Sequence, residues 1–467
     1  MRKTKIICTL GPASDSREKI REMIQAGADI FRLNMSHAEH EWVRRIVSLI
    51  REVSAEIHTT TAILLDTQGP AVRTGDLANK LDLKPGNILE FTVRGARSEE
   101  EYSVDVNYDG LINDISEGDV VLVDNGVIHL KVLSKMNNKI RCEVLTEGVL
   151  GSRRHINLPG VKVNLPPLTE KDLRDIELGV SVGVDFVALS FCREPNDIVE
   201  LRKVLQAHGS TAKIIAKIED QHAVKHIDEI IMTTDIIMIA RGDLGVECPM
   251  EELPIIQRRI IKHCIKYGRP VIVATHMLES MISNPLPTRA EITDVANAVF
   301  EQADAIMLSG ESATGRYPVE SVKILDRVAK RIEQSGGANY AADAVIEDAR
   351  HKMVNSGVVL ANSFPDSKII VFTKAGNIAA FASHLRPAAA PIFAFSPSET
   401  TVRQLMIYRA VYPALMTFSI DPQHTVADAE NYLKEHGFVE KGDPLIILSD
   451  ILAGEERFDS IHLRRSY

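Results

Sequence analysis

The sequence has few cysteines, and their spacing suits neither a metal site nor a disulfide framework. Five cysteines are scattered along 467 residues, their number is odd, and no two form a CxxC pair. Scattered, reduced thiols are typical of proteins in a reducing compartment. Without a His/Cys cluster, a zinc site is not expected. These features predict a cytoplasmic protein.

Long apolar runs are also missing. No uninterrupted apolar stretch approaches the roughly 18 residues that span a bilayer, and the segment Ile6–Leu10 is too short for the core of a signal peptide. The net charge of −10 argues against nucleic acid as the main partner. A local basic cluster could still bind a small anion. We therefore expect neither a membrane nor a nucleic-acid partner.

Short apolar runs alternate with amphipathic stretches along most of the chain. Helical spacing of apolar residues predicts helices such as 17–25, 41–53, 253–267 and 319–334. Eight apolar runs read as strands, and such an alternation predicts an α/β fold with a closed (β/α)₈ TIM barrel. The expected strands are Lys5–Leu10, Ile30–Leu33, Ala62–Leu65, Phe186–Leu189, Ile214–Ile218, Ile236–Ala240, Val271–Ala274 and Ala305–Leu308.

The alternation is interrupted once and changes character near the C-terminus. Residues 70–159 carry short alternating runs and read as a small β domain inserted after the third strand, where it would act as a lid. Residues 1–69 and 160–335 then form the barrel domain. Residues 336–467 begin with a Gly-Gly pair, and helical stretches there alternate with expected strands at Lys368–Phe372, Ile392–Ala394 and Leu445–Leu448. They predict a C-terminal α/β domain, which we expect to be regulatory.

Catalytic side chains of barrel enzymes lie at the C-terminal ends of strands, and here those ends are polar. Lys217 and Glu219 point to the same side because a strand has period two. Asp243 follows the next strand and adds a second carboxylate. Two carboxylates with open positions suit Mg²⁺ or Mn²⁺. The simpler alternative for Lys217 and Glu219 is a structural ion pair.

Other strand ends offer further candidates. Gly242 could begin a short helix whose N–H groups bind an anion, or could only form a turn. Arginines near the barrel mouth match phosphate oxygens, although a lone arginine is more often solvated. A set of oxygen-bearing residues could bind a monovalent cation or only hydrogen-bond to each other. A last set could relay a proton or cap strands. The arginines are Arg32 and Arg73. The oxygen-bearing set is Asn34, Ser36, Asp66 and Thr67, and the last set is Thr275, Ser309 and Glu311.

Nine segments occur in an order that is specific to one family. They are Lys3–Ser14, Phe31–His37, Asp66–Pro70, Asn157–Gly160, Ile215–Glu219, Ala240–Glu247, Pro287–Glu291, Asp294–Ala298 and Met307–Glu311. Together they resemble pyruvate kinase, and the resemblance covers essentially the whole chain. It implies phosphoryl transfer from phosphoenolpyruvate to ADP, giving pyruvate and ATP. Family members usually form homotetramers.

The resemblance also implies roles for individual residues. Lys217 would stabilise the transferring phosphoryl group, and Glu219 and Asp243 would bind Mg²⁺. Substrate contacts would come from Arg32, Gly242, Asp243 and Thr275. Potassium ligands would be Asn34, Ser36, Asp66 and Thr67, and nucleotide contacts would be Asn34, His37, Arg73 and Arg154.

The sequence departs from the family pattern in several places, and two of these regions concern potassium dependence and activation. Thr67 and Thr74 favour potassium dependence, whereas Gln68 favours independence and Ala71 matches neither type, so both alternatives stay open. The C-terminal phosphate loop has Ala375 and Ile378 where the family carries hydroxyls, which argues against activation by fructose bisphosphate. Two other functions remain as alternatives: a Mg²⁺-dependent barrel lyase acting on enolates, and a non-catalytic metabolite-binding protein.

Overall fold

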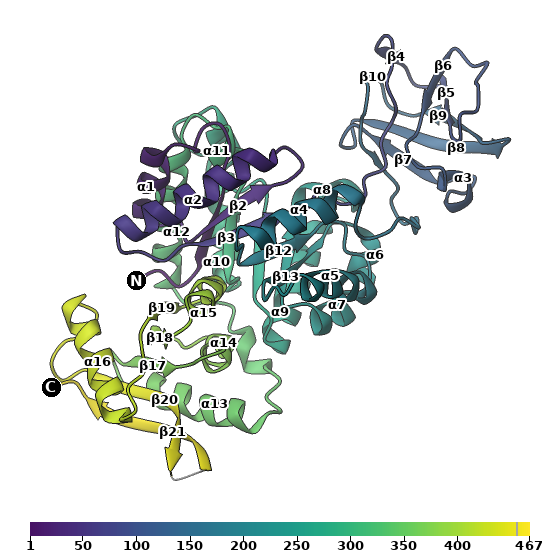
Figure 1. Ribbon diagram of the computed structural model, residues 1–467. Helices are drawn as coiled ribbons and strands as arrows, with labels where there is room; N and C mark the ends of the chain where they lie inside the picture. Colours follow the sequence, from purple (N-terminus) through teal and green to yellow (C-terminus); the bar gives the residue numbers. More distant parts are fainter. Residues whose placement is uncertain (454–455) are drawn as a thin grey trace.

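A closed barrel of eight parallel strands forms the centre of the molecule (Figure 1). The computed structural model describes residues 1–453 and 456–467. Around the barrel, the strands follow the order β1-β16-β15-β14-β13-β12-β3-β2, which confirms the predicted TIM barrel. Their bounds are β1 Lys5–Thr9, β2 Ile30–Asn34, β3 Ala62–Asp66, β12 Phe186–Leu189, β13 Lys213–Ile218, β14 Ile236–Ala240, β15 Val271–Ala274 and β16 Ala305–Leu308.

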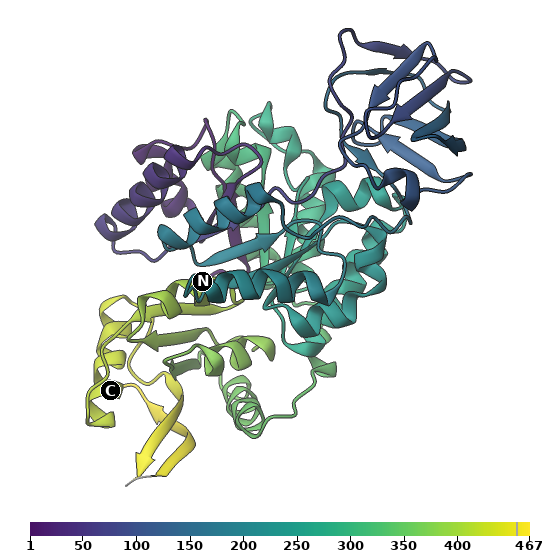
Figure 2. The same ribbon diagram turned by 45° about the vertical axis from the view of Figure 1, so that its right-hand side comes forward.

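Helices surround the barrel and cover its outer face (Figures 1 and 2). A capping box begins α4, where the Thr169 side chain accepts from the backbone of Asp172 and the Asp172 side chain accepts in return. The helices of this part are α1 Arg17–Ala26, α2 His40–Glu56, α4 Glu170–Ser181, α5 Pro195–Ala207, α6 Gln221–Lys225, α7 Ile227–Thr233, α8 Arg241–Glu247, α9 Leu253–Tyr267, α10 Arg289–Phe300, α11 Gly310–Ala313 and α12 Pro318–Glu333, with 3₁₀ turns η1 Glu279–Ile282 and η2 Tyr340–Asp343.

The segment between β3 and α4 forms a separate strand-rich domain, which we call the lid. It stands away from the barrel in both views (Figures 1 and 2). Strands β4 Leu81–Leu83 and β10 Gly148–Leu150 pair, and a second sheet has the order β11-β7-β8-β9-β5-β6. These strands are β5 Ile88–Thr92, β6 Tyr102–Asp105, β7 Val120–Val123, β8 Ile128–Met136, β9 Lys139–Val144 and β11 Ile156–Asn157, with the short helix α3 Leu111–Asp114. The lid has its own apolar cluster.

The C-terminal α/β domain is built on a five-stranded sheet of order β19-β18-β17-β20-β21. The three strands predicted there are present, and β19 and β21 are additional. Its elements are α13 Ala349–Asn362, β17 Lys368–Phe372, α14 Asn377–His384, β18 Ile392–Ser396, α15 Glu399–Gln404, η3 Leu405–Ile407, β19 Val411–Leu415, α16 Pro422–Glu435, β20 Pro444–Ala453 and β21 Glu456–Arg465.

The C-terminal domain closes the N-terminal end of the barrel. Met406 and Ile407 pack into the apolar cluster that fills the barrel interior. A buried ion pair joins Arg386 to Asp304 at 2.6 Å, and Asp304 also accepts from the backbone N–H groups of Val271 and Arg409. Asp304 therefore ties the start of two barrel strands to the C-terminal domain.

Two further sequence expectations concern cysteines and membrane spans. All five cysteines are buried and free. Within the described part of the chain, no helix is both long and apolar enough to cross a bilayer.

The buried carboxylate of Asp304 generates a stability prediction. Asp304→Ala leaves Arg386 buried without its counter-ion, and breaking such a pair costs about 3–5 kcal/mol. Urea denaturation followed by circular dichroism should show this loss in the free energy of unfolding. As a matched control, Glu200→Ala removes the exposed Glu200–Lys203 pair and should cost no more than about 1 kcal/mol. Equal losses in both variants would contradict the role of Asp304.

Candidate active site

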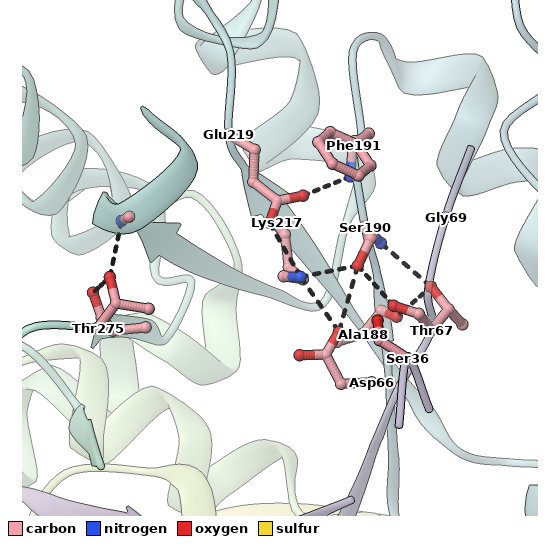
Figure 3. Close-up of polar contacts among 12 residues, drawn as sticks. Ser36, Asp66, Thr67, Gly69, Ala188, Ser190, Phe191, Lys217, Glu219 and Thr275 are labelled. Carbon is pink, nitrogen blue, oxygen red and sulfur yellow. Dashed lines mark hydrogen bonds and ion pairs between the residues drawn. The ribbon is translucent and has the colours of Figure 1, made fainter. Parts of the chain in front are cut away.

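The Lys217 side chain lies at the centre of a buried polar cluster at the C-terminal end of the barrel (Figure 3). Its ammonium lies 2.9 Å from Glu219 Oε1, 3.3 Å from Asp66 Oδ1 and 2.7 Å from Ser190 Oγ. Burial alone would lower the pKa of Lys217, but Asp66 and Glu219 raise it above its ordinary value. Lys217 is therefore a permanently charged ammonium that all three partners orient.

Glu219 is held from two sides. Its Oε1 atom lies against Lys217, and its Oε2 atom accepts the backbone N–H of Phe191 at 2.6 Å. Phe191 adopts a left-handed conformation with φ of 53°, which is uncommon for a residue other than glycine. The pKa of Glu219 is raised to about 7, chiefly by burial and also by the charge of Asp243, although Lys217 lowers it. A cation bound at this carboxylate would therefore stabilise its ionised form.

Asp243 is the second carboxylate of the candidate metal centre. It lies in the first turn of α8, is half-buried, and contributes its charge to the pKa of both Glu219 and His155. Among the described residues, no group of three or more His, Cys, Asp or Glu side chains could hold a metal by itself. Glu219 and Asp243 are hard oxygen donors of the kind that Mg²⁺ prefers, and an ion held by two carboxylates takes its other oxygens from water and substrate.

Arg32 brings a second positive charge to the cluster. Its Nε donates to Asp66 Oδ2 at 2.6 Å, and its Nη1 donates to Thr9 Oγ1 at 2.9 Å. Burial would raise the pKa of Asp66, but Lys217 and Arg32 hold it below its ordinary value. Asp66 is therefore an ionised carboxylate that joins the two cations.

Thr275 and Gly242 meet on the other side of the barrel mouth. The Thr275 hydroxyl accepts the Gly242 N–H at 2.8 Å and donates to Ala274 O at 2.6 Å (Figure 3). Thr275 has a left-handed φ of 68°, and Arg241 donates to its carbonyl oxygen at 2.7 Å. These contacts fix the first turn of α8, which carries Asp243, relative to the end of β15.

The four candidate potassium ligands lie at the ends of β2 and β3. Asn34 pairs directly with Asp66 across the two strands. Asn34 Oδ1 accepts from the backbone of Ser36 at 3.1 Å, and Thr67 Oγ1 donates to Ala188 O at 3.0 Å. The structure therefore brings this set together, next to Lys217.

Ser309 and Glu311 occupy the end of β16. Glu311 is 2% exposed, and its two oxygens accept the backbone N–H groups of Leu278 and Ser309. Among the residues that the structure describes, the buried Ser309 hydroxyl has no hydrogen-bond partner. Glu311 thus links the loops that follow β15 and β16, as a strand-end cap does, and a role in proton relay stays a prediction.

The candidate nucleotide contacts are divided between two domains. Asn34 ends β2 and the exposed His37 follows that strand, whereas Arg73 and Arg154 are exposed on the lid. Arg154 lies 3.3 Å from Asp124, and Arg73 donates to Arg153 O at 3.3 Å. Within the described chain, no hydrogen bond connects Asn34 or His37 to these two arginines.

Two residues of the site were absent from the sequence-based candidates. Ser190 and Phe191 directly follow β12 and contact Lys217 and Glu219 (Figure 3). The strand-end rule that identified the other candidates also applies to this fourth barrel strand. Applied there, it would have identified both residues.

Comparisons with known proteins identify the family of the chain. Residues 1–322 match the family model "Pyruvate kinase, barrel domain", and residues 351–462 match "Pyruvate kinase, alpha/beta domain". The chain is 40% identical over 466 residues to "Plastidial pyruvate kinase 3, chloroplastic" of Arabidopsis thaliana, covering 99% of this chain and 81% of the relative. It is 41% identical over 470 residues to the pyruvate kinase of Geobacillus stearothermophilus, covering 97% and 78%.

A solved structure shows the same architecture. The crystal structure of a pyruvate kinase from Cryptosporidium parvum superimposes with a TM-score of 0.95 at 34% identity, covering 100% of this chain and 96% of that one. The match extends over the barrel, the lid and the C-terminal domain. The chain therefore belongs to the pyruvate kinase family, whose members convert phosphoenolpyruvate to pyruvate.

Proposed function

We propose that this chain transfers the phosphoryl group of phosphoenolpyruvate to ADP at the Lys217 cluster. The observation that carries the proposal is a buried ammonium beside two carboxylates, at the barrel end where such enzymes act. Phosphoryl transfer needs charge neutralisation and alignment more than covalent chemistry, and this cluster supplies fixed charge. The combination of family membership and cluster geometry supports this function over a lyase.

In the proposed reaction, the bond between phosphorus and the enol oxygen breaks, and a terminal oxygen of ADP bonds to phosphorus. Lys217 and Arg32 neutralise the negative charge of the transferring group. A divalent ion held by Glu219 and Asp243 would supply Lewis-acid stabilisation of the phosphoryl oxygens and the enolate. Gly242 and Thr275 would seat the substrate while the enolate takes a proton at its methylene carbon and becomes pyruvate.

The lid would provide the nucleotide contacts. Arg73 and Arg154 carry positive charge on it, and Asn34 and His37 stand on the barrel side. Closure of the lid over the barrel would bring both groups to one nucleotide and exclude water, which otherwise competes for the phosphoryl group. The homotetramer, the regulatory role of the C-terminal domain and a cytoplasmic location remain proposals that rest on the family relationship.

Turnover tests the proposed function directly. Pyruvate should form from phosphoenolpyruvate only when ADP is present, in a coupled lactate dehydrogenase assay. Turnover that ignores ADP would instead support the lyase, and ligand binding without any turnover would support the non-catalytic alternative.

Lys217→Met tests the role of the central ammonium. Removing a cation that stabilises the transferring phosphoryl group should lower kcat by at least about 10³-fold. The melting temperature should show a folded protein. Lys203→Met, which replaces an exposed lysine on α5, serves as the matched control with unchanged kcat. Near-normal turnover of Lys217→Met would refute the assignment.

Glu219→Gln tests the metal site. The variant loses one of two negative ligands, so the Mg²⁺ concentration that gives half-maximal turnover should rise by at least about tenfold. Titration with Mg²⁺ under saturating substrates measures this. The exposed Glu200→Gln is the control, and a Mg²⁺ requirement unchanged in Glu219→Gln would remove this residue from the metal site.

The oxygen-rich set around Asp66 leads to a potassium prediction. We expect turnover to rise severalfold in KCl relative to tetramethylammonium chloride at equal ionic strength, because the bulky cation cannot enter a site built from Asn34, Ser36, Asp66 and Thr67. Equal turnover in the two salts would identify a potassium-independent enzyme.

A further inference from the structure

Ser190 stands between the charged groups of the site and a backbone carbonyl. The residue is 2% exposed and directly follows β12. Its hydroxyl oxygen accepts from the Lys217 ammonium at 2.7 Å and donates to Thr67 O at 2.7 Å, with Asp66 Oδ1 at 3.3 Å (Figure 3). Its backbone N–H donates to Thr67 Oγ1 at 3.2 Å. Hydrogen bonds of both the side chain and the backbone of Ser190 therefore fix the direction of its hydroxyl group.

The three partners of Lys217 differ in charge. An ammonium has three N–H donors, and Glu219, Asp66 and Ser190 take one each. Glu219 and Asp66 are carboxylates, so separating either one from Lys217 in a buried site would cost the energy of an unpaired charge. Ser190 is the neutral partner, and an anionic phosphoryl oxygen can replace it without leaving a buried carboxylate unpaired.

We propose that Ser190 is a positioning residue that holds the third N–H of Lys217 toward the place of the transferring phosphoryl group. The proposal rests on the proposed function above. Ser190 acts through Lys217, and its hydroxyl keeps the ammonium from turning fully toward Asp66 and Glu219. The adjacent Phe191 N–H fixes Glu219 at the same time, so one turn after β12 sets the separation of the lysine and the metal-binding carboxylate.

Ser190→Ala and Ser190→Cys test this role together. Alanine removes the acceptor, and cysteine keeps a similar shape with a sulfur that accepts hydrogen bonds weakly. Because a misplaced catalytic group can cost up to about 100-fold, we expect kcat to fall about 10- to 100-fold in both variants. KM for phosphoenolpyruvate should stay within about twofold, since ground-state binding is retained.

Two further measurements separate positioning from a structural or metal-binding role. Binding of Mn²⁺ to the substrate-free protein, followed by electron paramagnetic resonance, should be unchanged in Ser190→Ala. Adding Ser190→Ala to Lys217→Met should cause no further loss, because a residue that acts through Lys217 has no effect without it. Ser321→Ala is the matched control, because it removes a buried hydroxyl of α12 that donates to the carbonyl oxygen of Tyr317. The kcat of this variant should equal that of the wild type.

Specific outcomes would overturn the positioning role. Wild-type kcat in Ser190→Ala or Ser190→Cys would do so, as would weakened Mn²⁺ binding or an additive loss in the double variant. Should the alanine variant not fold, the cysteine variant and the Mn²⁺ measurement on it decide the question. A wild-type protein that forms no pyruvate would instead overturn the proposed function, which distinguishes the two failures.

Discussion

The structure of the site depends on a buried ammonium that carboxylates keep charged. Lys217 contacts Asp66 and Glu219, and Asp66 in turn contacts Arg32. A buried charge is tolerated only when its partners offset the loss of hydration. Since the two cations face two carboxylates, with Asp243 nearby, the cluster carries an excess of negative charge. A divalent ion would reverse that balance and make the site attractive to a phosphate ester.

A single barrel strand connects this cluster to the opposite end of the barrel. Asp185, which precedes β12, accepts from Arg403 of the C-terminal domain at 2.7 Å and from the backbone of Ile63 at 2.8 Å. Ser190 and Phe191 follow the same strand and hold Lys217 and Glu219. The four residues of β12 thus join the C-terminal domain to the site through a rigid, fully buried segment.

Periodicity was enough to predict the barrel, because eight apolar runs separated by amphipathic helices have few other ways to bury their surface. The missed strand β19 contains Pro413, which argues against a central strand but is compatible with the sheet edge that β19 occupies. Lys217, Glu219 and Asp243 could be proposed from the sequence because they lie at or just after the C-terminal ends of barrel strands, where such enzymes carry catalytic groups. Ser190 is an ordinary residue type, and its contacts lie 27 and 123 residues away in the sequence. Only the folded chain reveals these contacts of Ser190.

Burial of apolar surface stabilises the barrel, whereas polar contacts orient the lid relative to it. The apolar clusters of the two domains are separate, so burial of apolar surface does not fix their relative position. Polar contacts act at the connections: Asp172 accepts from the backbone of Gln68 and Gly69, and Asn157 donates to Glu247 at 2.9 Å. Glu247 is the last residue of α8, which carries Asp243 in its first turn. Because Asn157 contacts α8, the helix that carries Asp243, a ligand that bridges the lid and the barrel would act on both sides of this connection.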